Sequence, residues 1–152
     1  MGKEKVTLTK IFTFDAAHVL ENHPGKCKHI HGHTYHLHVT VTGEIIDKIN
    51  HPNNGMIIDF TDLKRWIHDS VLNLFDHALL LHEKSSTAKL DFPDRERIYL
   101  TKYTPTCENM LVDIVDRLKQ SAPNNIYLDE VRLQETPTAF STWKAYTNFI
   151  IP

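Results

Sequence analysis

Residues 31–42 read HGHTYHLHVTVT, and their alternation of apolar and polar residues predicts a β-strand from about residue 31 to residue 45. The odd-numbered positions form one set: His31, His33, Tyr35, Leu37, Val39 and Val41. The even-numbered positions form the other: Thr34, His36, His38, Thr40 and Thr42. Since successive side chains of a strand point to opposite faces, the odd face should pack on a core. The even face should meet water or line a polar interior between subunits.

A matching strand is predicted just before it, at residues 6–14 (VTLTKIFTF). Its apolar positions share one parity, and if the alternation continues, Ala16 and His18 lie on the same apolar face. Asn22, Pro24 and Gly25 mark the loop between the two strands. The two strands should therefore bring His18 close to the start of the second strand.

Further elements follow along the chain. They are a returning hairpin strand at 56–60, a helix from its N-cap Thr61 to about 75, an insertion at 82–104 with a short strand at 98–100, a helix from about 105 to 122, strands at 126–135 and 140–146, and a tail at 147–152. No linker or repeat interrupts the chain, so residues 1–152 should form a single domain. This order predicts an α+β fold in which two helices cover one face of an antiparallel sheet.

Composition excludes several classes of protein. The 152 residues carry a formal net charge of -2, with 41% hydrophobic and 24% charged residues, as ordinary globular proteins do. A nucleic-acid-binding protein normally carries a basic excess, so no nucleic-acid partner is expected. No apolar run approaches the roughly 20 residues that span a membrane, and no secretory signal is expected at the N-terminus. Two cysteines, Cys27 and Cys107, cannot form a disulfide framework, so we expect a cytoplasmic protein.

His31 and His33 are two residues apart on one face of a strand. His18 lies at the end of the preceding strand, which is expected to pair with this one. Three neutral imidazoles without a fourth protein ligand are typical of a catalytic zinc site with an open position. The alternative is that these histidines are ordinary polar residues. That alternative is weaker for a pair on an apolar face, where unpaired polar groups cost free energy. His29 is the nearest further candidate ligand.

Cys27, Asp76 and His77 could carry proton transfer. Cys27 lies between Lys26 and Lys28, whose charges favour a thiolate. A carboxylate beside an imidazole, as in Asp76-His77, can orient it and raise its basicity. A single cysteine can equally be an inert apolar residue, and the residues alone pair Cys27 with His77 only weakly.

Glu135 follows Val131 and Leu133 on an expected core face, where a carboxylate needs a partner or a ligand. A planar edge of N–H donors could pair with it in bidentate fashion, and an internal salt bridge is the alternative. Thr106 and Glu108 lie at the start of the second helix, where N-capping and first-turn charge explain them without any ligand.

Six separated motifs occur in order between about residue 6 and residue 144. They are FDAAH (14–18), CKHIHGHTY (27–35), Asp59-Phe60, FDH (75–77), PTxEN (105–109) and Glu135-Thr136. Together they resemble the 6-pyruvoyltetrahydropterin synthase family, which includes the 6-carboxytetrahydropterin synthases of queuosine (7-deazaguanine) biosynthesis.

The resemblance implies a T-fold (tunnelling fold), with three sheets joined into a barrel and two trimers stacked into a homo-hexamer. It implies Zn²⁺ bound by His18, His31 and His33, a catalytic Cys27 thiolate, and an Asp76-His77 relay. It also implies a pterin held by Glu135 and lined by Thr106 and Glu108. The implied substrate is 7,8-dihydroneopterin triphosphate.

Three residues separate Cys27 from His31, and this spacing resembles the carboxy-forming branch of the family. A longer spacer is typical of the pyruvoyl-forming branch, which stops after loss of triphosphate and tautomerisation. The expected function is therefore a lyase that forms 6-carboxytetrahydropterin and acetaldehyde. The alternatives are the pyruvoyl-forming enzyme, a non-enzymatic zinc-binding oligomer, and a cysteine hydrolase that needs no zinc.

Overall fold

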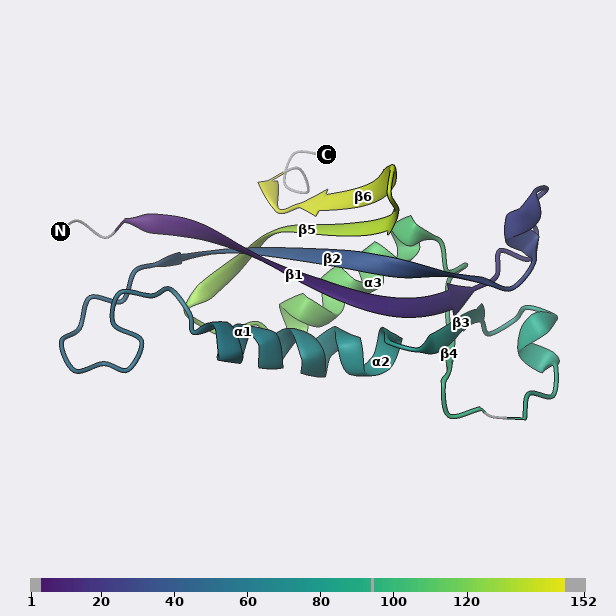
Figure 1. Cartoon of the computed structure of the whole chain (residues 1–152), viewed down its shortest axis with the longest axis horizontal. Helices are drawn as coiled ribbons and strands as arrows, with labels where there is room; N and C mark the ends of the chain where they lie inside the picture. Colours follow the sequence, from purple (N-terminus) through teal and green to yellow (C-terminus); the bar gives the residue numbers. More distant parts are fainter. Residues whose placement is uncertain (1–3, 94, 147–152) are drawn as a thin grey trace.

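A computed structural model describes residues 4–93 and 95–146. Over these residues the chain forms one six-stranded sheet, ordered β4-β3-β1-β2-β5-β6, with its longer helices on one face (Figure 1). The strands are β1 (Lys5–His18), β2 (His31–Glu44), β3 (Ala78–His82), β4 (Ile98–Thr101), β5 (Ile126–Thr136) and β6 (Ala139–Lys144). The helical segments are η1 (Lys26–Lys28), α1 (Phe60–Ile67), η2 (His68–Leu72), α2 (Asn73–Phe75), η3 (Thr87–Lys89) and α3 (Cys107–Gln120). The expected α+β class, with two helices on one face of the sheet, is confirmed.

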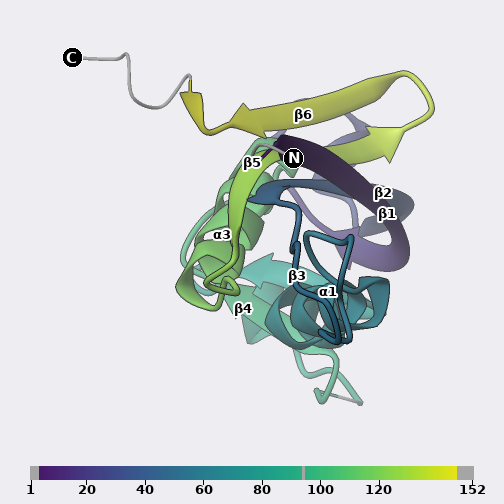
Figure 2. The same cartoon turned by 90° about the vertical axis from the view of Figure 1, so that its left-hand side faces the viewer.

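The long antiparallel pair β1–β2 forms the centre of the sheet. Its register sets His18 opposite His31, Ala16 opposite His33 and Phe14 opposite Tyr35. Residues directly opposite in an antiparallel pair point to the same face, so these pairs share the helix side. The sheet curls over the helices, as the turned view shows (Figure 2).

The core lies between this face of the sheet and the helices. Tyr35, Leu37, Val39 and Val41 of β2 are fully buried, as the odd-numbered alternation predicts. From the helices, the buried side chains include Leu63, Ile67, Val71, Met110, Ile114 and Leu118. Burial of each such side chain contributes roughly 1.5–3 kcal/mol, so this layer fixes the position of β2 firmly.

The other face of β1–β2 is polar. Thr7 and Thr42 lie opposite each other with their hydroxyls 3.2 Å apart, and Thr9 and Thr40 are joined in the same way at 2.8 Å. His36 and His38 belong to this face, so they point away from His31 and His33. The expected polar face of the second strand is therefore present.

The first helical layer is continuous from Phe60 to Phe75 but changes its winding midway. A π-helical stretch, η2, adds a residue to the turn, so the buried stripe moves from Leu63 and Ile67 to Leu72 and Phe75. Leu74 follows Leu63, Ile67 and Ser70 at helical spacing and would be buried under regular winding, but it is only partly buried. The π turn is what brings Phe75 under Phe14.

The strand predicted at 56–60 is wrong. Residues 51–59 form turns and a loop, in which Ile57 and Ile58 are buried, and the free edge of β2 is taken by β5. The Asn125 side chain donates to the Ile57 carbonyl at 2.6 Å and fixes this loop against the start of β5. The N-cap of α1 is Asp59, which accepts from the Thr61 amide, and not Thr61 as predicted.

The sheet is mixed and not wholly antiparallel. β3 pairs in parallel with the end of β1 over three residues, and β4 pairs in parallel with β3. β3 was missed in the sequence, and β4 lies within the segment 82–104, where a short strand was expected. As a result, the carboxyl ends of β1, β3 and β4 lie at the same end of the sheet, close to the histidines.

No helix among the described residues is long and apolar enough to cross a membrane. The predicted tail at 147–152 lies outside the described residues.

Candidate metal centre and active site

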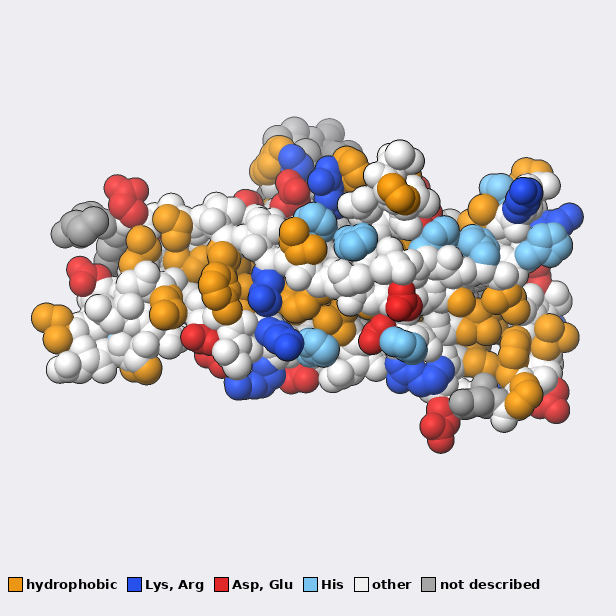
Figure 3. Space-filling view, viewed as in Figure 1, with side chains coloured by type: hydrophobic (Ala, Val, Ile, Leu, Met, Phe, Trp, Pro, Cys, Tyr) orange, Lys and Arg blue, Asp and Glu red, His pale blue; other side chains and the backbone are white. Residues whose placement is uncertain are grey.

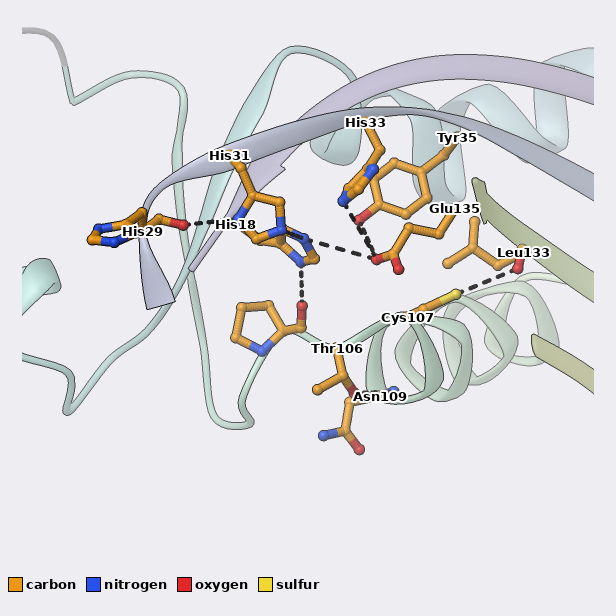
Figure 4. A network of polar contacts seen from close by, with 11 residues as sticks. His18, His29, His31, His33, Tyr35, Thr106, Cys107, Asn109, Leu133 and Glu135 are labelled. Atoms are coloured by element: carbon orange, nitrogen blue, oxygen red, sulfur yellow. Dashed lines mark hydrogen bonds and ion pairs between the residues drawn. The ribbon is translucent and has the colours of Figure 1, made fainter. Parts of the chain in front are cut away.

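Three imidazoles converge where β1 ends and β2 begins (Figure 4). One ring nitrogen from each of His18, His31 and His33 lies within 4.8 Å of the others, a spacing that can hold a metal ion. His18 and His31 face each other across the strand pair, and His33 stands opposite Ala16, whose small side chain leaves room for the ring. His18 is 2% exposed, so its ring is fixed by packing.

Backbone carbonyls set the tautomers of two of the rings. His18 Nδ1 lies 2.7 Å from the Pro105 carbonyl, and His31 Nδ1 lies 2.8 Å from the His29 carbonyl. A carbonyl only accepts, so each Nδ1 carries a hydrogen and each Nε2 presents a lone pair. Partners of this kind are typical of metal-ligating histidines, because they orient the ring and raise its basicity.

The two Nε2 atoms of His18 and His31 lie 3.1 Å apart. Two lone pairs at this distance repel each other unless a cation or a proton lies between them. Tetrahedral ligation at roughly 2.0–2.1 Å places two nitrogens about 3.3 Å apart, close to the observed separation. The separation of the two Nε2 atoms and the tautomers of the two rings are therefore both suitable for binding a metal ion.

Burial lowers the pKa of His18, an effect that the Pro105 hydrogen bond partly offsets. A metal-ligating histidine must be neutral, so this direction favours ligation at neutral pH.

Glu135 lies beside the three histidines. Its Oε1 is 3.8 Å from His18 Nε2 and 4.0 Å from His33 Nε2, and it accepts a 3.1 Å hydrogen bond from the Tyr35 hydroxyl. Burial, reinforced by the Glu135 carboxylate, raises the pKa of Tyr35, which therefore remains a donor. The Glu135 side chain is 23% exposed, so its carboxylate can accept a hydrogen bond from a further donor.

Asp76 and His77 form the second polar group of interest. Asp76 Oδ1 lies 2.9 Å from His77 Nδ1 and also accepts from the Asp15 amide at 3.1 Å. The His77 amide donates to the Asp15 carbonyl at 2.6 Å, so the turn is clamped to β1. His77 has a positive φ of 60° and a side chain that is 72% exposed. His77 lines a groove of about 460 Å³ that also includes His33 and Asp15.

Cys27 lies in η1, in the loop between β1 and β2, and is partly buried. Its carbonyl accepts from the Leu20 amide at 2.9 Å, which ties the loop to the residues that follow His18. Within the described residues, no hydrogen bond or ion pair joins Cys27 to Asp76 or His77. One chain thus brings the histidines and Glu135 together but leaves the three proposed catalytic residues in two places.

Thr106 and Glu108 lie at the start of α3, next to the Pro105 carbonyl that holds His18. Thr106 is the N-cap and accepts from the Asn109 amide at 3.3 Å. Glu108 is exposed in the first turn. The second thiol, Cys107, is buried and donates toward the Leu133 carbonyl, so it is a packed residue.

Two members of this site were missed in the sequence. Tyr35 was assigned to the core, and Pro105 was read only as a helix start. The parity of Tyr35 places it in line with His31 and His33, which is the one signal that could have identified it. Nothing local predicts that the Pro105 carbonyl meets His18, because the two residues are joined only by the tertiary fold.

Comparison with known proteins gives the family. The family model described as 6-pyruvoyl tetrahydropterin synthase matches residues 7–145. The chain is 33% identical over 141 residues to a protein of Haemophilus influenzae named 6-carboxy-5,6,7,8-tetrahydropterin synthase, covering 90% of this chain and 97% of that one. A protein of the same name from Bacillus subtilis is 28% identical over 138 residues and covers 90% and 84%.

A solved structure agrees with these matches. The 6-pyruvoyl tetrahydropterin synthase of Caenorhabditis elegans superimposes with a TM-score of 0.65 at 27% identity, covering 93% of this chain and 96% of that one. The expected T-fold is confirmed, and the chain is an enzyme of the lyase type. On the matched sequence, the matched fold and the cluster of three histidines, this chain belongs to the 6-pyruvoyl tetrahydropterin synthase family.

Proposed function

We propose that this protein is a 6-carboxy-5,6,7,8-tetrahydropterin synthase. It converts 7,8-dihydroneopterin triphosphate into 6-carboxytetrahydropterin, acetaldehyde and triphosphate, as a cytoplasmic step of queuosine biosynthesis. The observation that carries the proposal is the convergence of one ring nitrogen from each of three imidazoles beside the Glu135 carboxylate. The names and the identity of the relatives from Haemophilus influenzae and Bacillus subtilis support the choice of branch.

The metal is zinc in this proposal, held by His18, His31 and His33. Imidazole ligands suit zinc, and three of them leave one position open for substrate. When bound, zinc supplies a Lewis acid that polarises the side-chain oxygens of the substrate. The carbonyls of Pro105 and His29 fix the rings of His18 and His31 with their Nε2 atoms facing each other, where both could ligate the ion.

Proton transfer falls to Cys27, Asp76 and His77. The Cys27 thiolate removes a proton from the substrate side chain, and His77 returns one. Asp76 accepts from His77 Nδ1, which leaves Nε2 of that ring free to take or give the proton. The exposure of His77, together with the absence of a hydrogen bond or ion pair between it and Cys27 among the described residues, supports a site that is completed by a second copy of the chain.

The pterin is held by Glu135, whose carboxylate can accept two parallel N–H bonds from the 2-amino and N3–H edge. Tyr35 fixes the carboxylate from the buried side. Thr106 and Glu108 line the pocket at the start of α3.

The assembly in this proposal is a hexamer made of two trimers. The sheet supports it, because β6 lies at one edge of the sheet and β3 covers β1 only at Ala16–His18. The first part of β1 and the outer edge of β6 therefore have unpaired backbone groups among the described residues, and such edges pair readily with another chain.

The test is product analysis after incubation with 7,8-dihydroneopterin triphosphate. Acetaldehyde released together with 6-carboxytetrahydropterin supports the proposal. Release of triphosphate with 6-pyruvoyltetrahydropterin and no acetaldehyde contradicts it and identifies the pyruvoyl-forming reaction.

A further inference from the structure

A second cavity of about 500 Å³ lies beside the metal centre and has no role so far. We call it the loop cavity, and it is lined by residues 19–23, 82, 84, 85, 104 and 106. These segments follow the ends of β1, β3 and β4, which run parallel to one another. Crevices outside the carboxyl ends of parallel strands are recurrent ligand sites, and the volume is within the usual range for small molecules.

The loop cavity is connected to the proposed active site through the chain. Val19 directly follows His18, and Thr104 and Thr106 flank the Pro105 carbonyl to which His18 donates. Leu20 in the lining donates its amide to the Cys27 carbonyl. The lining of the cavity is therefore continuous along the chain with His18 and with its hydrogen-bond partner Pro105.

Two histidines of the lining have fixed tautomers. His23 Nδ1 accepts from the Gly25 amide at 2.9 Å, and His82 Nδ1 accepts from the Lys84 amide at 3.0 Å. An amide only donates, so the hydrogen of each neutral ring lies on Nε2. Both rings are therefore N–H donors even when uncharged, which is opposite to the tautomers of His18 and His31.

One cationic side chain, Lys84, and one carboxylate, Glu21, belong to the lining. The Lys84 ammonium has no carboxylate within ion-pair distance among the residues that the structure describes, and its side chain is exposed. Figure 3 shows further basic and histidine side chains gathered at the loop that joins β1 and β2. Lys26 and Lys28 of η1 belong to that loop.

The carboxylate in the lining, Glu21, is already engaged. It accepts from the amide and hydroxyl groups of both Ser86 and Thr87, with the amide bonds at 2.7 and 3.1 Å. The Ser86 hydroxyl, followed by these amides, lowers the pKa of Glu21. Glu21 thus joins the loop after β1 to the start of η3. Its carboxylate oxygens face Ser86 and Thr87.

We propose that the loop cavity is a polyphosphate-binding site, in which Lys84, His23 and His82 donate to phosphate oxygens. During the reaction proposed above, the loop cavity holds the triphosphate of the substrate while Glu135 holds the pterin. This role in the reaction rests on the proposed function. Triphosphate is the leaving group, so a cationic site there stabilises the charge that develops as the C–O bond breaks.

The test is a binding experiment on metal-loaded protein that carries Cys27→Ala to prevent turnover. Three ligands are titrated: 7,8-dihydroneopterin triphosphate, 7,8-dihydroneopterin, and inorganic triphosphate as its magnesium complex. The variants are Lys84→Ala and Lys84→Arg, with Lys89→Ala as the matched control from the same loop. Lys89 is exposed and does not line the cavity.

We expect Lys84→Ala to weaken binding of the triphosphate ester about tenfold or more, since charged hydrogen bonds have this strength. Binding of dihydroneopterin should change less than about twofold in the same variant, and Lys84→Arg should recover most of the loss. Lys89→Ala should leave all three affinities unchanged. Inorganic triphosphate should compete with the ester and share its dependence on Lys84.

The outcomes separate the two proposals. If dihydroneopterin binds but Lys84→Ala affects neither phosphorylated ligand, or Lys89→Ala has the same effect, the polyphosphate site is wrong and the proposed function stands. If no pterin binds while inorganic triphosphate binds through Lys84, the anion site stands and the proposed function is wrong.

Discussion

The three histidines and the Asp76–His77 pair are two polar groups of similar chemistry in very different surroundings. His18 is buried, and its ring and that of His31 are each held by a backbone carbonyl. His77 is 72% exposed, and among the described residues it is oriented by its neighbour Asp76 and by a clamped turn. One group is complete within a single chain, while the other faces outward.

The difference shows which part of the chemistry the fold supplies by itself. Metal ligands must converge before the ion arrives, so the fold positions them through backbone contacts and burial. A proton relay needs only to reach the substrate when it is bound, and it can be completed by a neighbouring chain. Changes to the two groups should therefore separate metal binding from turnover.

His18→Ala should have the largest effect. Metal affinity should fall by more than about 100-fold, because loss of outer partners alone costs about 10- to 100-fold. Metal content measured by elemental analysis after dialysis checks this. His29→Ala is the matched control, since only the carbonyl of His29 is used. Equal metal content in His18→Ala and the parent protein would contradict the proposed site.

His77→Ala should abolish most turnover and leave the metal in place. General acid–base groups contribute typically 10²- to 10⁴-fold, so kcat should fall by about that factor. Steady-state kinetics and metal content, measured on the same preparation, separate the two effects. His51→Ala, in the exposed loop before α1, is the control. Loss of metal from His77→Ala would show that the two groups are not independent.

These two groups also differ in how well they could be predicted from the sequence. The parity of the two alternating stretches was enough to bring His18, His31 and His33 together. Glu135 was expected on a core face, and it does lie beside them. Cross-strand position follows from period-two patterning, which is a local property of the chain.

Contacts set by tertiary structure were not predictable. β3 is a five-residue strand, Ala78–His82, that pairs with β1 over three residues, and its short apolar run resembles a buried helix segment equally well. The π turn at His68–Leu72 leaves no mark in a 3.6-residue pattern. The strand expected at 56–60 failed because β5, some 70 residues later in the sequence, competes for the same edge of β2.

Tyr35→Phe tests the contact between Tyr35 and Glu135 and should have a smaller effect than the histidine variants. It removes the hydroxyl that donates to Glu135, so the Michaelis constant for the pterin substrate should rise about five- to tenfold with little change in kcat. Metal content should be unchanged. Tyr103→Phe is the control, because its hydroxyl donates to Asp113, away from the site. An unchanged Michaelis constant would remove Tyr35 from the account.

Gly32→Ala should have the smallest effect. A Cβ atom at this position would lie 3.1 Å from the Ala16 carbonyl oxygen, so β1 and β2 would have to separate slightly between His31 and His33. We expect a loss of about 1 kcal/mol, seen as a fall in melting temperature of roughly 2–4 °C. A melting temperature equal to that of the parent would show that the strands can adjust at no cost.

The most direct test of the central claim is a zinc titration of protein from which metal has been removed by a chelator. Acetaldehyde release from 7,8-dihydroneopterin triphosphate is measured at each step. We expect no release without metal, a linear rise up to one zinc ion per chain, and no response in His18→Ala. Full activity in the metal-free protein, or a rise that His18→Ala shares, would contradict it.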